Sequence, residues 1–171
     1  MWYNEQGYEC KTKTYFYHFF YLVPTLVIMY FLSTTGYGYS KKLCNNVVGW
    51  FLNQYLPRHK LYIDVHHRGL LNEGAFGYCD YTDQSYKPRD FTIELHARMD
   101  KKLYVETLLH ELIHLRQWVR GTLKFKAGKM MFNDENVSKY EYMDQPHEIE
   151  AYALEGKLYS DWYSTNGGIL K

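Results

Sequence analysis

The chain of 171 residues contains only three cysteines, Cys10, Cys44 and Cys79, and they lie far apart. An odd number without a CxxC pair excludes a disulfide framework and a zinc site built from paired cysteines. We therefore expect free thiols in a reducing, cytoplasmic compartment. The chain also lacks internal repeats and low-complexity tracts, so its length predicts one domain with a substantial core.

The sequence has no excess of charge of either sign. The chain has twenty Lys and Arg residues and nineteen Asp and Glu residues, which gives a formal net charge of +1. The basic residues are dispersed among acidic ones and form no Lys/Arg-rich block. Because a nucleic-acid surface usually shows such a block, no nucleic-acid partner is expected.

Formal charge is absent from one long aromatic and aliphatic run, residues 15–32. Its length is at the short end of what crosses a bilayer, and His18 and Pro24 weaken that assignment. Three interpretations stay open: a membrane anchor or poorly cleavable signal, a soluble apolar extension, or upstream sequence from a mis-assigned start. Residues 1–38 are accordingly assigned to an N-terminal extension, and residues 39–171 to the main domain.

The run His110-Glu111-Leu112-Ile113-His114 is an HExxH motif. Side chains four residues apart on a helix project from one face, so the imidazoles of His110 and His114 can bind the same tetrahedral zinc ion. Glu111 is placed to accept a proton from an attacking water and to return it to a leaving amine. The motif therefore predicts a metal site with a catalytic base.

The residues around the motif predict a long, buried helix. Asp100 is a good N-cap, Gly121 suits the position after the helix, and no Pro or Gly interrupts the sequence between them. Apolar residues surround the motif on most sides of this helix, which indicates burial on more than one face. Buried polar groups need partners, and a metal ion supplies one for the two histidines.

The rest of the chain predicts a mixture of strands and helices. Ser40 can cap a first helix, which Pro57 ends. The polar chain between Ala127 and Ser138 is predicted to be a connection that turns at 133–136. The predicted elements are a helix at 41–55, strands at 61–65, 73–81 and 91–95, the motif helix at 101–120, a short alternating segment at 122–126 and a closing helix at 146–163.

Three further histidines, His66, His67 and His96, are given no metal role. The first two are neighbours after a strand, where adjacent side chains point to opposite faces and cannot easily serve one ion. His96 stands at the end of another strand. All three are expected to be surface or packing residues.

A catalytic zinc usually has three protein ligands and one open position, so the motif needs a partner elsewhere. The closing helix offers His147, Glu148 and Glu150. Positions 148 and 150 lie about 200° apart around a helix axis, so a helix that aims one at the ion turns the other away. Helical geometry by itself leaves these alternatives nearly even.

Two blocks of the sequence resemble SprT-like and phage-encoded metallopeptidases: an HExxH-x-x-Q helix that extends to Gln117, and a P-x-E-x-E-A block at residues 146–151. In related zincins with a glutamate as third ligand, that glutamate precedes a small residue by three positions. Glu148 and Ala151 fit this pattern, so the resemblance implies Glu148 as the third ligand. Tyr152 stands where those families often have an Asn or Asp that orients a ligand histidine.

The resemblance implies a zincin-like α+β domain, in which the motif helix packs across a small twisted sheet and the closing helix delivers the third ligand. It implies a zinc-dependent metallopeptidase that acts on a protein or peptide substrate in the cytoplasm of a host cell. His110, His114 and Glu148 would bind Zn²⁺, and Glu111 would be the general base. Candidates for stabilising the oxyanion are Tyr140, Tyr142 and Tyr152.

Two alternatives were weighed against the peptidase. Peptide deformylases also carry HExxH, but they take a cysteine ligand from a Gly-Cys-Leu type motif, which Gly77-Tyr78-Cys79-Asp80 does not match. The other is a zincin-fold binding or virion-associated module with a structural zinc and no turnover. The intact Glu111 argues against it, because a structural zinc site needs no base.

Overall fold

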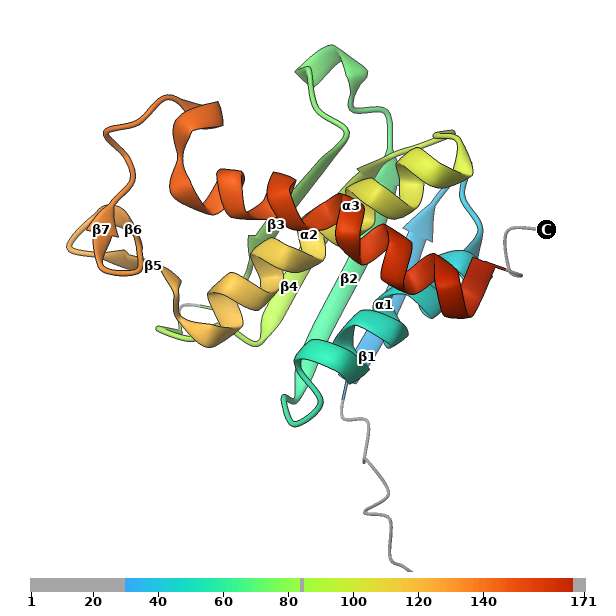
Figure 1. Cartoon of the computed structure of the whole chain (residues 1–171), viewed down its shortest axis with the longest axis horizontal. Helices are drawn as coiled ribbons and strands as arrows, with labels where there is room; N and C mark the ends of the chain where they lie inside the picture. The colour runs from blue at the N-terminus through green and yellow to red at the C-terminus, as the bar shows by residue number, and fades with distance from the viewer. Residues whose placement is uncertain (1–29, 84, 168–171) are drawn as a thin grey trace, which may run out of the picture.

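The computed structural model describes residues 30–83 and 85–167 and shows a mixed α+β fold (Figure 1). Four strands form the main sheet in the order β1-β2-β4-β3. Strands β1, β2 and β4 run parallel, and β3 pairs antiparallel with β4 at one edge. The bounds of these strands are β1 Tyr30–Gly36, β2 Leu61–Arg68, β3 Gly77–Tyr81 and β4 Asp90–His96.

Three helices accompany the sheet: α1 (Lys41–Tyr55), α2 (Lys101–Arg120) and α3 (Pro146–Asn166). The predicted caps form. The Ser40 hydroxyl accepts a hydrogen bond from the Leu43 amide at 3.3 Å, and the Asp100 carboxylate accepts two from the first turn of α2 at 3.0 Å. Helix α2 ends at Gly121, whose φ of +75° is the left-handed conformation that glycine adopts most readily.

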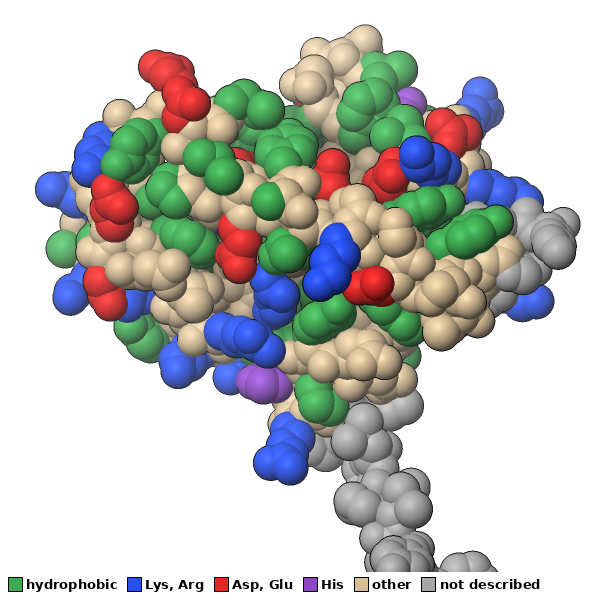
Figure 2. All heavy atoms as spheres, in the orientation of Figure 1, with side chains coloured by type: hydrophobic (Ala, Val, Ile, Leu, Met, Phe, Trp, Pro, Cys, Tyr) green, Lys and Arg blue, Asp and Glu red, His purple; other side chains and the backbone are tan. Residues whose placement is uncertain are grey.

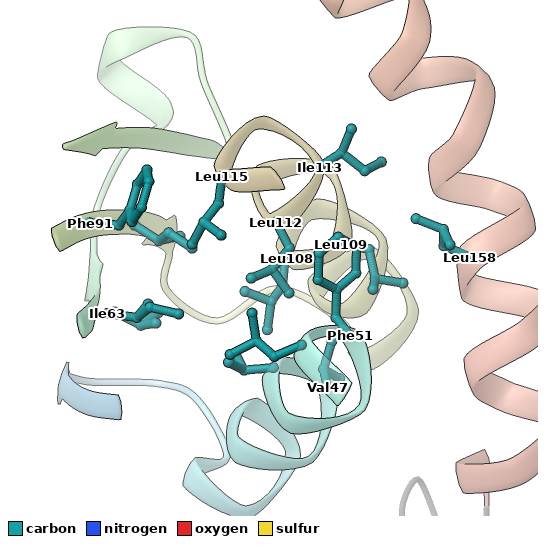
Figure 3. Packing of buried hydrophobic residues seen from close by; sticks show 14 of the residues in the cluster. Val47, Phe51, Ile63, Phe91, Leu108, Leu109, Leu112, Ile113, Leu115 and Leu158 are labelled. Carbon is teal, nitrogen blue, oxygen red and sulfur yellow. The ribbon is translucent and has the colours of Figure 1, made fainter. Parts of the chain in front are cut away.

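Helix α2 is the centre of the core, which explains why it is apolar on most sides. Figure 3 shows its leucines between Ile63 and Phe91 of the sheet and Val47 and Phe51 of α1, with Leu158 of α3 beyond them. Along β2 and β4 every second side chain is buried against the core, as is expected for a sheet with one covered face. The helix that carries HExxH is therefore held rigidly by the sheet and both other helices.

The sheet begins earlier than the sequence predicts. Residues 30–36 had been assigned to the N-terminal extension, but they form β1, with Tyr30 opposite Leu61 and Gly36 opposite His67. Residues 30–32 end the apolar run and residues 33–36 are Ser, Thr, Thr and Gly, so the segment shows no alternation from which a strand can be recognised. The rest of the proposed membrane segment, residues 15–29, lies outside the described residues. No helix within the described ranges is long and apolar enough to cross a bilayer.

Two other stretches differ from the predicted elements. The segment 127–138, predicted as a loop, contains β6 (Lys129–Phe132) and β7 (Glu135–Asn136), which join β5 (Leu123–Lys126) in a small second sheet. These strands are too short to show a clear period. The strand predicted from residue 73 starts only at Gly77, because the 3-10 turn η1 (Leu71–Glu73) precedes it.

Acidic and basic side chains are scattered over the face drawn in Figure 2, as the balanced composition suggests.

Candidate metal centre

Helix α2 and the first turn of α3 bring three donor atoms together. The Nε2 nitrogens of His110 and His114 lie 3.2 Å apart, and each is 3.4 Å from the Oε2 oxygen of Glu148. The four-residue spacing puts both imidazoles on one face of α2, while Pro146 at the start of α3 places Glu148 in its first turn. All three side chains are more than nine-tenths buried.

Each imidazole is oriented through its other nitrogen. Nδ1 of His110 lies 2.8 Å from a carboxylate oxygen of Glu155, and Nδ1 of His114 lies 2.9 Å from the amide oxygen of Gln117. These oxygens only accept hydrogen bonds, so both Nδ1 atoms donate, and in the neutral imidazoles both Nε2 atoms carry the lone pair. Contacts of this kind fix the tautomer and ring orientation of metal-binding histidines.

The donor set fits a metal ion. Glu148 Oε2 is buried and has no hydrogen-bond partner among the described residues. Two nitrogen lone pairs and a carboxylate oxygen within 3.4 Å of one another repel unless a cation or a proton lies between them. Two imidazoles with one carboxylate form a common ligand set for catalytic zinc. This buried group can therefore hold a metal ion.

When no metal ion is bound, the charges of the site favour protonation of His110 and His114. Burial acts against the charged imidazole, but the neighbouring carboxylates of Glu148 and Glu155 outweigh it and raise the pKa of His110 to about 9. The pKa of His114 is raised in the same way, chiefly by Glu148. Burial also acts to raise the pKa of Glu148, but the two histidines hold it well below its usual range. A metal ion would replace these protons.

Glu111 lies beside this group without belonging to it. Its side chain is buried, yet it makes no hydrogen bond or ion pair with any residue in the described ranges. Burial, together with the nearby carboxylates of Glu148 and Glu155, raises its pKa to about 7 against the opposing effect of the histidines. A carboxylate with a pKa near neutrality is well suited to accept and return a proton.

The site opens into a cleft of about 670 Å³ that follows α2. One wall is formed by β3 and the chain before it, and the other by α3 and the 3-10 turn η2 (Tyr142–Asp144). Among the described residues, no Lys or Arg lines this cleft. The volume of this cleft is large enough for a substrate longer than a single residue, and His110, His114 and Glu148 are among the residues that line it.

The two alternative third ligands are placed elsewhere. The Glu150 carboxylate accepts hydrogen bonds from Gln117 at 2.8 Å and from Arg116 at 3.2 Å, and it is not part of the donor group formed with the histidine pair. His147 is buried, and its Nε2 lies 3.6 Å from the second oxygen of Glu148. Of the three candidates, Glu148 is the one that joins His110 and His114.

The remaining histidines make structural contacts. His67 is buried between the rings of Tyr39 and Tyr104, and it forms a hydrogen bond with the Tyr104 hydroxyl at 3.0 Å. Nδ1 of His96 accepts a hydrogen bond from the Leu70 amide at 3.1 Å. Neither of them, nor His66, belongs to the metal-binding group found among the described residues.

Two of the three candidate tyrosines line the cleft. Partial burial and the nearby Glu148 carboxylate raise the pKa of the Tyr142 hydroxyl. The Tyr152 ring lies 4.7 Å from that of His110. The Tyr140 hydroxyl instead donates to Glu135 at 2.6 Å, outside the cleft lining.

The sequence did not identify the roles of Glu155 and Gln117. Glu155 shares a helix face with Glu148, about two turns further on, and this spacing is the only sequence signal for it. Gln117 donates through Nε2 to the His147 carbonyl at 3.1 Å as well as to Glu150. Its single amide group therefore connects a metal-binding histidine of α2 to the start of α3.

No protein-family model, curated protein or solved structure matches the chain. The resemblance to SprT-like metallopeptidases consequently rests on the two sequence blocks. What the fold defines is a buried group of two imidazoles and one carboxylate, at the side of a cleft, that can hold a metal ion.

Proposed function

We propose that the protein is a zinc-dependent metallopeptidase with a zincin-like arrangement of its sheet and helices. One observation carries this proposal: an unpaired, buried Glu111 carboxylate lies beside a three-donor metal group that faces an open cleft. In this proposal His110, His114 and Glu148 bind zinc, and Glu111 is the general base.

The number of donors favours a catalytic metal over a structural one. Structural zinc sites are closed by four protein ligands, whereas catalytic sites keep one position open. The described part of the chain supplies three donors here, next to the cleft. When bound, zinc polarises the scissile carbonyl and lowers the pKa of the attacking water. A binding module with a structural zinc and no turnover needs neither the open position nor Glu111.

Glu111 supplies the proton transfers. Burial raises the pKa of Glu111 to about 7 in the metal-free site, and a zinc ion on the neighbouring donors would lower it and favour the ionised carboxylate. The carboxylate can then take a proton from the attacking water and release it to the leaving amine. The carboxyl oxygens have no competing hydrogen-bond partner within residues 30–83 and 85–167. The base is therefore free to bond water and substrate.

Within residues 30–83 and 85–167, β3 is an edge strand that pairs only with β4, and this supports a peptide as substrate. The Phe76 carbonyl accepts from the His96 amide at 2.8 Å, and the Thr82 amide donates to the Asp90 carbonyl at 3.0 Å. Antiparallel pairing alternates, so the N–H and C=O groups of residues 77, 79 and 81 point away from β4. An extended peptide can add to such an edge through main-chain hydrogen bonds.

Metal analysis of the full chain with two matched variants tests the metal site. The purified protein is expected to bind one zinc per chain, Glu148→Gln to lose most of its affinity, and Glu150→Gln to keep it. Hydrolysis of a denatured protein should stop on chelation and return when zinc is added. Zinc binding without any hydrolysis would favour the binding module, and loss of zinc in Glu150→Gln alone would contradict the ligand set.

A further inference from the structure

Gly77, the first residue of β3, lies directly against the side chain of Glu111. A Cβ atom added at Gly77 would lie 2.5 Å from Oε1 of Glu111 and 3.0 Å from both its Cδ and Cγ atoms. Real Cβ atoms essentially never lie closer than 3.0 Å to another atom, so a side chain at residue 77 would force the Glu111 carboxylate or the strand to shift.

The backbone of Gly77 does not need glycine for its conformation, since its φ lies outside the positive range. Successive side chains of β3 point to opposite faces of the sheet. Cys79 and Tyr81 therefore share with Gly77 the face that is directed toward α2. Tyr81 packs against Trp118 further along α2, and burial together with the nearby Glu111 carboxylate raises the pKa of the Cys79 thiol. Residue 77 is the position where an added Cβ would collide with Glu111 itself.

Packing is what holds Glu111 in place. Its carboxylate has no hydrogen-bond or ion-pair partner in the described part of the chain, and the side chain is only 5% exposed. A side chain without polar anchors adopts the position that its neighbours leave open. Gly77 forms the wall on the side of the sheet, and the histidine pair lies on the side of the cleft.

We propose that Gly77 is a positioning residue for Glu111: its missing side chain sets the distance of the carboxylate from the metal group and from a peptide on the β3 edge. A methyl group at position 77 would displace the carboxylate toward the histidines and the cleft. The contact itself is independent of catalysis, whereas its kinetic consequence rests on the proposed function.

A thermal-unfolding cycle tests the contact without any activity assay. Gly77→Ala should lower the Tm by roughly 5 °C, as overpacking does in a domain of this size. In a Glu111→Ala background the Oε1, Cδ and Cγ atoms that the methyl group would meet are absent, so the same substitution should cost much less. An equal loss of Tm in both backgrounds would show that Glu111 is not the neighbour that requires glycine, and would overturn the proposal.

A kinetic comparison tests the consequence. Gly77→Ala is expected to bind one zinc per chain, to keep KM within about two-fold, and to lose kcat by roughly 100-fold, the scale of general-base catalysis. Gly156→Ala is the control, because an added Cβ there meets nothing within 4 Å. Wild-type kcat in a folded Gly77→Ala protein would refute the positioning role. A wild-type protein that hydrolyses nothing would defeat the proposed function instead and leave the thermal cycle to decide whether Gly77 places Glu111.

Discussion

His110 and Glu155 form a hydrogen bond of 2.8 Å between the imidazole Nδ1 and a carboxylate oxygen, across the interface of α2 and α3. Glu155 is two turns beyond Glu148, so one face of α3 supplies both a donor atom for the metal group and the partner that orients a ligand histidine. Tyr152, which occupies the position expected for such a partner, contacts His110 only through its ring.

Removing the Glu155 carboxylate should weaken metal binding without removing a ligand. We expect Glu155→Leu to lower zinc affinity by about 10- to 100-fold, and Glu155→Gln to lower it less because the amide oxygen still accepts from Nδ1. Competition with a chromophoric chelator measures the affinity. Asp161→Asn, at an exposed position of α3, is the control. Equal affinity in Glu155→Leu and wild type would show that His110 needs no partner.

Gln117 should contribute both to stability and to metal binding. Gln117→Leu leaves the His114 Nδ1 and the His147 carbonyl without this partner and removes one of the two donors to Glu150, and the Gln117 side chain is fully buried. We expect a loss of about 1–3 kcal/mol in the free energy of unfolding.

Urea denaturation of the metal-free protein measures the effect of Gln117→Leu. Gln54→Leu makes the same change at an exposed position of α1 and should be close to neutral. If both variants had the same stability, the three hydrogen bonds of Gln117 would contribute nothing net.

The metal-free protein should lose stability as the pH rises. The folded-state pKa of His110 is about 9, above its ordinary value of 6.5, so its contribution is complete below about pH 6.5 and is lost as the pH rises through 9. The lowered pKa of Glu148 acts in the opposite direction, and its contribution is lost in acid. The Tm of chelator-treated protein should therefore fall from pH 6.5 to 9.5, and this fall should be smaller in His110→Ala. A Tm that rises over this interval would contradict the charge arrangement of the site.

The cleft tyrosines should differ from Tyr140 in their effect on hydrolysis. Tyr142 places its hydroxyl beside Glu148, where it can donate to an oxyanion, so Tyr142→Phe is expected to lower kcat by roughly 100-fold. Tyr140→Phe removes only the hydrogen bond with Glu135 and should leave kcat unchanged. Steady-state kinetics on a peptide substrate distinguishes the two. The reverse order of effects would remove Tyr142 from the site.

Local signals were sufficient for the parts of the fold that depend on neighbouring residues. The caps Ser40 and Asp100 and the stop at Gly121 are set by short-range hydrogen bonds and backbone conformation, so the bounds of α1 and α2 were predicted correctly. Strand β1 was missed because its pairing partner, β2, starts about thirty residues later and its own residues, three apolar ones followed by Ser33, Thr34, Thr35 and Gly36, show no alternation that marks a strand.

In the metal group, too, the features set within one helix could be predicted, whereas those set by the packing of two helices could not. The spacing of His110 and His114 follows from one helix, whereas the choice between Glu148 and Glu150 depends on how α3 is rotated against α2. In the structure Glu148 joins the histidine pair, whereas Glu150 is bonded by Gln117 and Arg116 of α2. Glu155 could not be assigned from the sequence, since its contact depends on the crossing of two helices rather than on spacing.

The central claim is that Glu111 is the base beside a zinc ion held by His110, His114 and Glu148. Turnover of a denatured protein substrate by Glu111→Gln, with its zinc content determined on the same sample, tests this claim most directly. The amide keeps the shape of the side chain but cannot take a proton, so we expect one zinc per chain and a loss of turnover of at least about 100-fold. Zinc-loaded Glu111→Gln that hydrolyses the substrate at the wild-type rate would contradict the account.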